Sequence, residues 1–186
     1  MLHWSWMPVQ TIGAIITSSM KEPSLTKHLR DILILPFMVT VVIPSLIYNK
    51  NQTFVPDNII LKAAGIFFFL TGLYLFLWTN YLFKTFGKGT LAPWTVKQHL
   101  VIRGPYQYCR NPMITGVLFI LIGETLFLHS TSILTWTCIF FFVHIFYFAF
   151  KEEPDLYKRF GEEYKTYKEN VPRWIPRLRP YQGNEW

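Results

Sequence analysis

The chain has 186 residues, of which 51% are hydrophobic and 18% aromatic, but only 16% are charged. A soluble domain carries about 25% charged residues, and here the apolar residues gather into long runs, so the composition excludes an ordinary soluble protein. The formal net charge of +7 does not indicate nucleic-acid binding, because the Lys and Arg residues flank apolar runs and do not gather on one folded face. We therefore predict an integral membrane protein that binds the lipid bilayer and no nucleic acid.

Long apolar runs predict the membrane-spanning helices, since a helix needs about 20 apolar residues to cross a hydrocarbon layer of about 30 Å. The four strong runs are Leu29 to Tyr48, Ile59 to Phe83, Pro112 to Leu128 and Thr131 to Phe150. Only His129 and Ser130 separate the last two, so these should form a tight helical hairpin. Pro36 and Pro44 interrupt the first run, but neighbouring helices in a membrane can supply the lost hydrogen bonds.

The N-terminal run, Trp4 to Met20, is short and is interrupted by Pro8. It fits either a fifth span or a helix lying in the membrane interface. The fold class we predict is therefore all-α: one domain over residues 1–186, a polytopic membrane helix bundle with four to five transmembrane helices.

The distribution of positive charge predicts the orientation. Lys and Arg residues gather in residues 84–111 and 151–186, whereas the loop 49–58 has only Lys50 and the turn at 129–130 has none. By the positive-inside rule, the 84–111 connector and the C-terminal tail face the cytoplasm. In the tail, apolar side chains recur at three- and four-residue spacing and predict one amphipathic helix, Glu152 to Asn170, that lies against the membrane or the connector.

Signatures of soluble enzymes are absent: the chain has no GxGxxG, GxxxxGK[ST], HExxH or GxSxG. Its two cysteines, Cys109 and Cys138, form no CxxC pair, and we predict no metal site. His144 is interpreted as a helix-contact residue. Glu124, within an apolar run, is interpreted as a structural hydrogen-bonding group or as part of a substrate path.

Two polar segments could carry chemistry. In the connector, Gly104-Pro105 predicts a turn, and Asn111 before Pro112 fits the N-cap of the next helix. After the last apolar run, Glu152 and Glu153 stand out against the basic trend of the tail. A purely structural interpretation is open for both segments: a loop with a capped helix start, and acids in the first turn of a helix. The alternative is that one carboxylate faces the connector and binds a ligand.

The same two segments carry a family resemblance. The stretch HLVIRGPYQYCRNPMITG (99–116), followed by EEPDLYKRFGEEYKTYKENVPRWIP (152–176), resembles the C-terminal half of the isoprenylcysteine carboxyl methyltransferases and their prokaryotic relatives, and phospholipid methyltransferases share the broad pattern. The similar region covers about 98–176. The chain has Asn111 where eukaryotic members have His, and Phe148 near the position where they carry an Arg.

The resemblance implies a membrane methyltransferase with a cytoplasmic pocket for S-adenosylmethionine, formed by a loop and a C-terminal helix, with S-adenosylhomocysteine as product. The residues implied to bind the cofactor are Gln98, His99, Leu100, Val101, Tyr106, Asn111, Pro112, Met113, Ile114 and Glu152.

The acceptor is expected to be lipophilic and to enter from the bilayer. Our first prediction is carboxyl methylation of an isoprenylcysteine-like substrate, which needs no general base because the carboxylate is already ionised. Arg110 or Arg173 could then orient the carboxylate. For the alternative, a phospholipid amine, Glu152 or Glu153 would be the candidate base.

Two further alternatives belong to other classes of protein. Membrane sterol reductases have a related C-terminal region that binds NADPH, and a non-catalytic membrane subunit would use the same motifs only to stabilise a helix bundle. Binding of S-adenosylhomocysteine discriminates between the methyltransferase and both alternatives.

Overall fold

The computed structural model describes residues 34–50, 52–86 and 100–182, apart from the side chains of residues 83 and 84, so Gln98, His99 and Trp4 to Met20 lie outside the described residues. The elements in chain order are η1 (Met38–Val42), α3 (Ile43–Ile47), α4 (Ile59–Phe86), η2 (Gly104–Gln107), α5 (Pro112–Leu128), α6 (Thr131–Tyr147), η3 (Phe148–Glu152) and α7 (Glu153–Asn170). The prediction of an all-α protein is confirmed for the described residues, in which the β-structure is limited to a bridge between Thr53 and Ser130.

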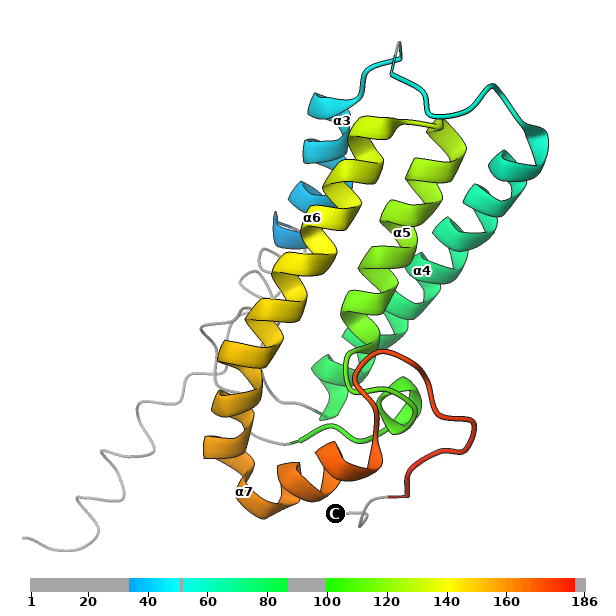
Figure 1. Cartoon of the computed structure of the whole chain (residues 1–186). Helices are drawn as coiled ribbons and strands as arrows, with labels where there is room; N and C mark the ends of the chain where they lie inside the picture. The colour runs from blue at the N-terminus through cyan, green and yellow to red at the C-terminus, as the bar shows by residue number, and fades with distance from the viewer. Residues whose placement is uncertain (1–33, 51, 87–99, 183–186) are drawn as a thin grey trace, which may run out of the picture.

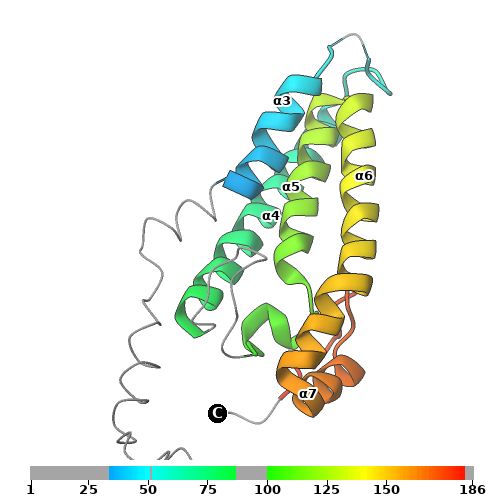
Figure 2. The same cartoon turned by 90° about the vertical axis from the view of Figure 1, so that its left-hand side faces the viewer.

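Four apolar helical stretches run side by side in a bundle (Figures 1 and 2). In the described part of the chain, two helices, Ile59–Leu82 and Thr131–Asn170, are long and apolar enough to cross a membrane, and Ile34–Ile47 and Pro112–Leu128 are apolar but shorter. The stretch formed by η1 and α3 packs on α5 and α6, while α4 covers another side of α5. The helices thus coincide with the four strong apolar runs that the sequence predicts to span the membrane, except that α4 continues past Phe83 to Phe86.

Helices α4 and α5 approach each other backbone to backbone. A Cβ atom on Gly72 would lie 2.6 Å from the carbonyl oxygen of Gly116, and one on Gly123 would lie 2.7 Å from that of Gly65. Both distances are too short for a real side chain, so glycine is required at this interface. Small residues are the usual means by which membrane helices pack closely, because the bilayer offers little hydrophobic drive for helix association.

Pro44 explains why the first apolar helix widens into a π-turn. The N–H of Ile43 bonds to Met38 O, which is an i to i+5 bond, and in that register the next carbonyl, Val39 O, would need an N–H that Pro44 lacks. Trp136 Nε1 on α6 donates to Val39 O at 3.1 Å instead. A neighbouring helix therefore supplies the missing hydrogen bond, as predicted for this proline.

A second π-turn links α6 to α7. In η3 the N–H of Glu153 bonds to Phe148 O, immediately before Pro154, and the chain then continues helically into α7. The predicted tail helix is therefore present, but it begins at Glu153 and is continuous with the last apolar helix. It is also broken at Gly161, whose φ of 53° and ψ of −129° are accessible essentially to glycine alone. The predicted helix is thus confirmed, but it is kinked, because a single glycine redirects α7 beneath the bundle (Figure 1).

The opposite end of the bundle is closed by the predicted tight hairpin. His129 adopts a left-handed conformation, with φ of 52°, that ends α5, and Ser130 Oγ accepts a hydrogen bond from Ile133 N at the start of α6. The N–H of Phe54 donates to His129 O at 3.1 Å, which ties the 48–58 loop to the hairpin. The described residues of the connector and the tail meet at the other end of the bundle, beside α7.

Candidate functional site

A cavity of about 390 Å³ lies at the α7 end of the bundle. Apolar residues of the bundle helices line one part of it: Leu35, Pro36, Val39, Val117, Phe140 and Val143. Polar and aromatic residues of the connector, η3 and α7 line the other part, including Tyr106, Arg110, Asn111, Glu152, Arg159 and Tyr164. The cavity is therefore amphiphilic, and its volume lies within the range of about 300–1,000 Å³ of small-molecule sites.

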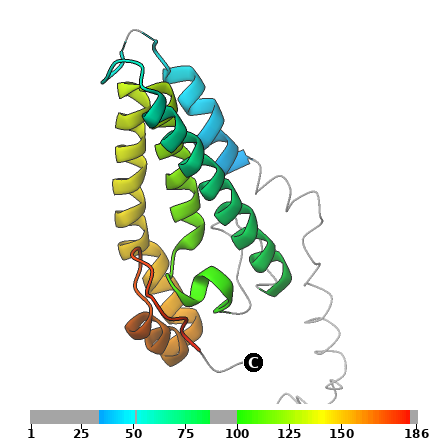
Figure 3. The ribbon, with the colours of Figure 1, turned by 90° about the vertical axis from the view of Figure 1, so that its right-hand side faces the viewer.

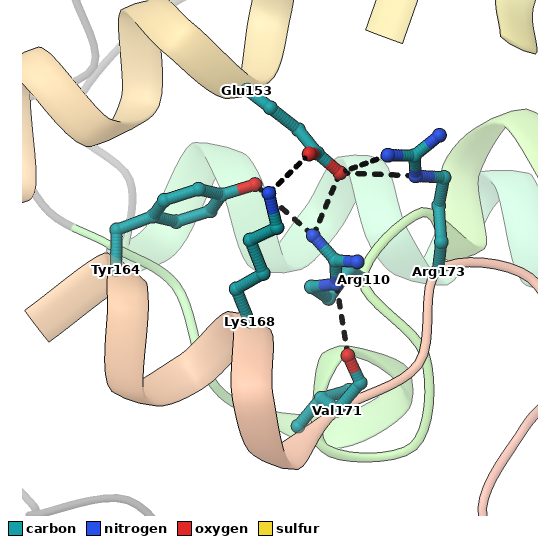
Figure 4. A network of polar contacts seen from close by, with 6 residues as sticks. All are labelled: Arg110, Glu153, Tyr164, Lys168, Val171 and Arg173. Carbon is teal, nitrogen blue, oxygen red and sulfur yellow. Dashed lines mark hydrogen bonds and ion pairs between the residues drawn. The ribbon is translucent and has the colours of Figure 1, made fainter. Parts of the chain in front are cut away.

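Glu153 holds the polar end together. Its Oε1 accepts a hydrogen bond from Arg110 Nη1 at 2.8 Å and two from Arg173, from Nε at 3.0 Å and Nη2 at 2.6 Å (Figure 4). Its Oε2 lies 2.8 Å from Lys168 Nζ. The Glu153 side chain is only 7% exposed, so these cations compensate a charge that is largely removed from water.

The balance of charge keeps Glu153 ionised. Burial by itself would raise the pKa of this carboxyl, but Lys168, Arg110 and Arg173 together outweigh burial and hold the pKa below its ordinary value. Arg110 is fixed further, since its Nε donates to Val171 O at 2.8 Å and its Nη1 reaches Tyr164 OH at 3.3 Å. Glu153 is thus a carboxylate bound to three cations.

The connector and the tail form one unit. Tyr167 OH donates to Tyr106 O at 2.7 Å, in a buried position between α7 and η2. Backbone hydrogen bonds join the same segments further along, from Arg110 N to Pro172 O at 2.9 Å and from Arg177 N to Tyr108 O at 3.0 Å. The connector and the acidic helix therefore come together as the sequence predicted, on one side of the cavity.

Two tyrosines in this unit are kept neutral. Burial raises the pKa of Tyr106 well above its ordinary value, and the neighbouring Tyr167 raises it further. Burial likewise raises the pKa of Tyr167. Both hydroxyl groups therefore act as hydrogen-bonding groups and not as bases at neutral pH.

Asn111 occupies the predicted N-cap position of α5, and Pro112 begins that helix, but the Asn111 side chain makes no capping hydrogen bond. Its Nδ2 is buried and has no hydrogen-bond partner among the described residues, although Asn111 lines the cavity. A buried donor without a partner costs about 1–3 kcal/mol, so an acceptor from a ligand would be stabilising here. The predicted role of the side chain as a helix cap was wrong.

Most of the residues predicted from the sequence line this cavity. They are Leu100, Val101, Tyr106, Arg110, Asn111, Met113, Ile114, Glu152, Glu153 and Arg173. Pro112 is fully buried at the start of α5 and is not among the lining residues.

Sequence reasoning missed the part of the wall that α6 contributes. Phe140, His144 and Phe148 line the cavity together with Glu152. These four residues are spaced by four along one helical face, so counting back from Glu152 would have found them.

His144 and Glu124 lie within two of the apolar helices. The Nδ1 of His144 lies 2.9 Å from Phe140 O, one turn earlier in its own helix, and His144 lines the cavity, while its interpretation as a helix-contact residue stays a prediction. Glu124 is not among the cavity-lining residues, and its Oε2 is buried without a hydrogen-bond partner in the described part of the chain. The structural hydrogen bond predicted for Glu124 is therefore not seen among the described residues, and the substrate path stays a prediction.

An apolar helix bundle with an amphiphilic cavity at one end defines a membrane protein with a small-molecule or lipid site. Residues 60–163, more than half of the chain, match the family described as phospholipid methyltransferase, and the chain belongs to this family. The family falls in the same membrane methyltransferase group as the isoprenylcysteine carboxyl methyltransferases, so the resemblance seen in the sequence is confirmed. The match begins at α4, before the predicted region 98–176, and ends within α7. No curated protein and no solved structure matches the chain.

Family membership has consequences for the fold and for the activity. It identifies a methyltransferase of the membrane, and members of this group use S-adenosylmethionine in general. The long apolar helices are compatible with a membrane helix bundle, and the family indicates lipids as the class of substrate.

Proposed function

We propose that the protein transfers a methyl group from S-adenosylmethionine to a lipophilic acceptor inside the amphiphilic cavity. The observation that carries this proposal is the cavity itself, which joins a polar end to an apolar part between the bundle helices. A polar cofactor and the chain of a lipid need opposite surroundings, and here one cavity offers both. The non-catalytic alternative explains the ion pairs but not the open cavity beside them.

The polar end fits the cofactor. The buried Nδ2 of Asn111 is a donor that a cofactor oxygen would satisfy, and Tyr106 and Glu152 line the same region. Apolar side chains of the connector, Leu100 and Val101, supply a surface for an adenine ring. The bound cofactor would supply a methyl group on a positively charged sulfur. The chain's own contribution is to hold donor and acceptor in line and to exclude water, and positioning of this kind contributes about 7–11 kcal/mol in well-oriented reactions.

Glu153 would act in this reaction by positioning. It links Arg110 of the connector to Arg173 of the tail, and each of these elements lines the cavity. Because Glu153 is ionised and bound on both oxygens, it is unsuited to accept a proton from a substrate. The general base needed by an amine acceptor would then be Glu152, which lines the cavity one residue earlier.

Two acceptor chemistries have a specific observation in their favour. A phospholipid amine is favoured because Arg110 and Arg173, the cations expected to orient a carboxylate, both bind Glu153 instead. A carboxylate, as in an isoprenylcysteine, is favoured because three cations surround the single carboxylate of Glu153, so that a second carboxylate could share them. The residues of the cavity would hold the acceptor's lone pair towards the methyl group, and an amine acceptor would first give its proton to Glu152, whereas a carboxylate would need no such step; the cofactor would supply the methyl group and remain as S-adenosylhomocysteine.

The membrane arrangement completes the proposal. We propose that the stretch Ile34–Ile47 and helices α4, α5 and α6 all cross the bilayer, and that the cavity opens at the cytoplasmic leaflet. The support is the excess of Lys and Arg in residues 84–111 and 151–186. Chemical labelling of single cysteines in oriented vesicles tests the orientation.

A thermal-shift measurement with S-adenosylhomocysteine tests the cofactor. At a ligand concentration of 100 Kd the folded protein should gain about 2.7 kcal/mol of stability. Glu152→Ala and Tyr106→Phe should reduce the shift, whereas Glu162→Ala, on the exposed part of α7, should leave it unchanged. A folded sample that responds to NADPH and not to S-adenosylhomocysteine would identify the reductase alternative, and no response to either would reject both enzymes.

Methyl transfer from radiolabelled S-adenosylmethionine in nanodiscs tests the acceptor. A methyl ester formed on a prenylcysteine is released by mild base, while a methyl group on a phospholipid nitrogen is stable. Parallel reactions with a prenylcysteine analogue and with phosphatidylethanolamine therefore separate the two chemistries by the lability of the product.

A further inference from the structure

The tail beyond α7 presents two aliphatic side chains outward. Ile175 is 80% exposed and Leu178 is 100% exposed, on a segment that contains Pro172, Pro176 and Pro180. Single exposed aliphatic residues are common on protein surfaces, so exposure alone indicates nothing. What distinguishes this segment is how firmly it is held and where it lies.

The segment is anchored on both sides of the exposed residues. Before them, Arg173 binds Glu153, and Pro172 O accepts a hydrogen bond from Arg110 N. After them, Tyr181 N donates to Gln107 O at 3.0 Å. The outward position of Ile175 and Leu178 is therefore fixed by the fold, although each apolar side chain would lower its free energy by leaving water.

Trp174 places the start of this segment at the level of the membrane. Its ring packs against Phe141 and Phe148, with centroid distances of 5.8 and 6.3 Å, beside the last turns of the membrane-spanning α6. Figures 1 and 3 show the tail rising from α7 to the level at which α5 begins before it turns down again. Ile175 is the next residue, with its Cα about 3.8 Å along the chain, so it lies at nearly the same depth.

Exposed apolar side chains of α6 and η3 follow or flank, in the sequence, the two rings that Trp174 packs against. These exposed side chains are Phe142, Phe146 and Phe150. In the membrane arrangement proposed above, these side chains face lipid. Leu178 lies further down the tail between Arg177 and Arg179, and the sequence thus passes from an aromatic residue through aliphatic residues to cations, as at a membrane interface.

The cations indicate which lipids the segment meets. Arg177 donates from Nη1 to Asn170 O at 2.8 Å and lies over the ring of Tyr181, so its guanidinium is oriented. Arg179 is exposed. Basic residues beside inserted apolar side chains bind anionic phospholipid headgroups by charge attraction.

We propose that residues 172–181 are an interfacial strap: Ile175 and Leu178 insert into the bilayer and Arg177 and Arg179 bind anionic lipid headgroups. Residues 60–163 match the family, so this strap lies outside the matched region. Because Arg173 in the strap binds Glu153 in the cavity wall, the strap connects the membrane surface to the candidate site. This inference requires the protein to lie in a membrane and does not depend on the reaction.

Fluorescence quenching tests the strap on the full-length protein in nanodiscs. Ile175→Cys and Leu178→Cys are each labelled with bimane in a Cys138→Ser background. Cys109 can stay, because it is only 4% exposed and burial raises the pKa of its thiol. We expect lipids with brominated acyl chains to quench both labels by at least about twofold, and aqueous iodide to quench them weakly, as for probes buried at the acyl boundary. Glu163→Cys, exposed on α7, is the control and should show the reverse.

The proposed binding of anionic lipid headgroups is tested by varying the lipid composition of the nanodiscs. Quenching at Leu178→Cys by brominated lipid should rise when phosphatidylglycerol replaces part of the phosphatidylcholine, and Arg179→Gln should reduce that rise while Lys165→Gln leaves it intact. Quenching of both labels by iodide alone would overturn the proposal. Protection from both quenchers, together with a doubled molar mass, would also overturn it by identifying a protein interface. If Ile175→Cys does not fold, because of its neighbour Trp174, the fully exposed Leu178 position decides.

Discussion

The α4–α5 interface and the polar end of the cavity are held together in opposite ways. At the interface, the glycines at positions 65, 72, 116 and 123 let two backbones approach until a Cβ atom would not fit. At the cavity, segments far apart in sequence are joined by charge, with Glu153 bound to Arg110, 43 residues away, and to Arg173, 20 residues away.

The difference follows from the surroundings of each region. Within the bilayer neither helix gains from hydrophobic burial, so close contact must come from small residues. At the cavity the chain must hold loops that have no regular hydrogen-bond ladder, and ion pairs with directional hydrogen bonds fix them. The stability of the α4–α5 interface should therefore depend on side-chain volume, and the stability of the cavity end should depend on side-chain charge.

The largest effect is expected for Glu153→Ala. This change leaves Arg110, whose side chain is 11% exposed, and Arg173 without their carboxylate, and breaking a buried ion pair costs about 3–5 kcal/mol. Chemical unfolding in detergent measures the loss. Glu162→Ala is the matched control, since its pair with Lys165 is exposed and should contribute less than about 1 kcal/mol. Equal losses in the two variants would show that the Glu153 network does not stabilise the cavity end.

A smaller effect is expected for Gly72→Ala. The added methyl group would meet Gly116 O at 2.6 Å and Ile120 N at 2.7 Å, so the helices must separate, and such overpacking costs about 1–3 kcal/mol. The same unfolding experiment applies. Ala63→Val adds bulk to an exposed position of α4 and should change stability by no more than about 0.5 kcal/mol. Unchanged or increased stability of Gly72→Ala would contradict the close approach.

The smallest effect on stability is expected from acidification. Acidification changes charge and not side-chain volume, so it should affect the cavity end and not the α4–α5 interface. Because the pKa of Glu153 is below its ordinary value of 4.5 in the folded protein, the unfolded chain binds more protons in this range. The stability that Glu153 contributes is thus complete above the unfolded pKa and is lost as the pH falls through the folded pKa. Unfolding midpoints measured from neutral pH to about pH 3 should fall more steeply for the wild type than for Glu153→Gln. Gly72→Ala should keep the wild-type pH dependence, and a flatter profile in that variant would mean that the regions are coupled.

Local pattern was sufficient to predict much of the protein. The α5–α6 hairpin, the beginning of α5 at Pro112 and the meeting of the connector with the acidic helix follow from apolar runs, proline chemistry and the order of the motifs. Most of the predicted cofactor residues line one cavity because they belong to the connector and to the start of α5, which are close in sequence. Glu152 joins them because η3 ends on the same side of the bundle.

The roles of individual polar groups depended on contacts between distant segments. The sequence could not show that Glu153 binds Arg110 and Arg173, that Asn111 leaves its Nδ2 without a partner in the described part of the chain, or that Gly161 breaks α7. The sequence by itself determined the helices, because apolar length and proline act over a few residues. The tertiary structure decided which charges meet and which groups stay available to a ligand, because the pairs of Glu153 with Arg173 and with Arg110 cross 20 and 43 residues of chain.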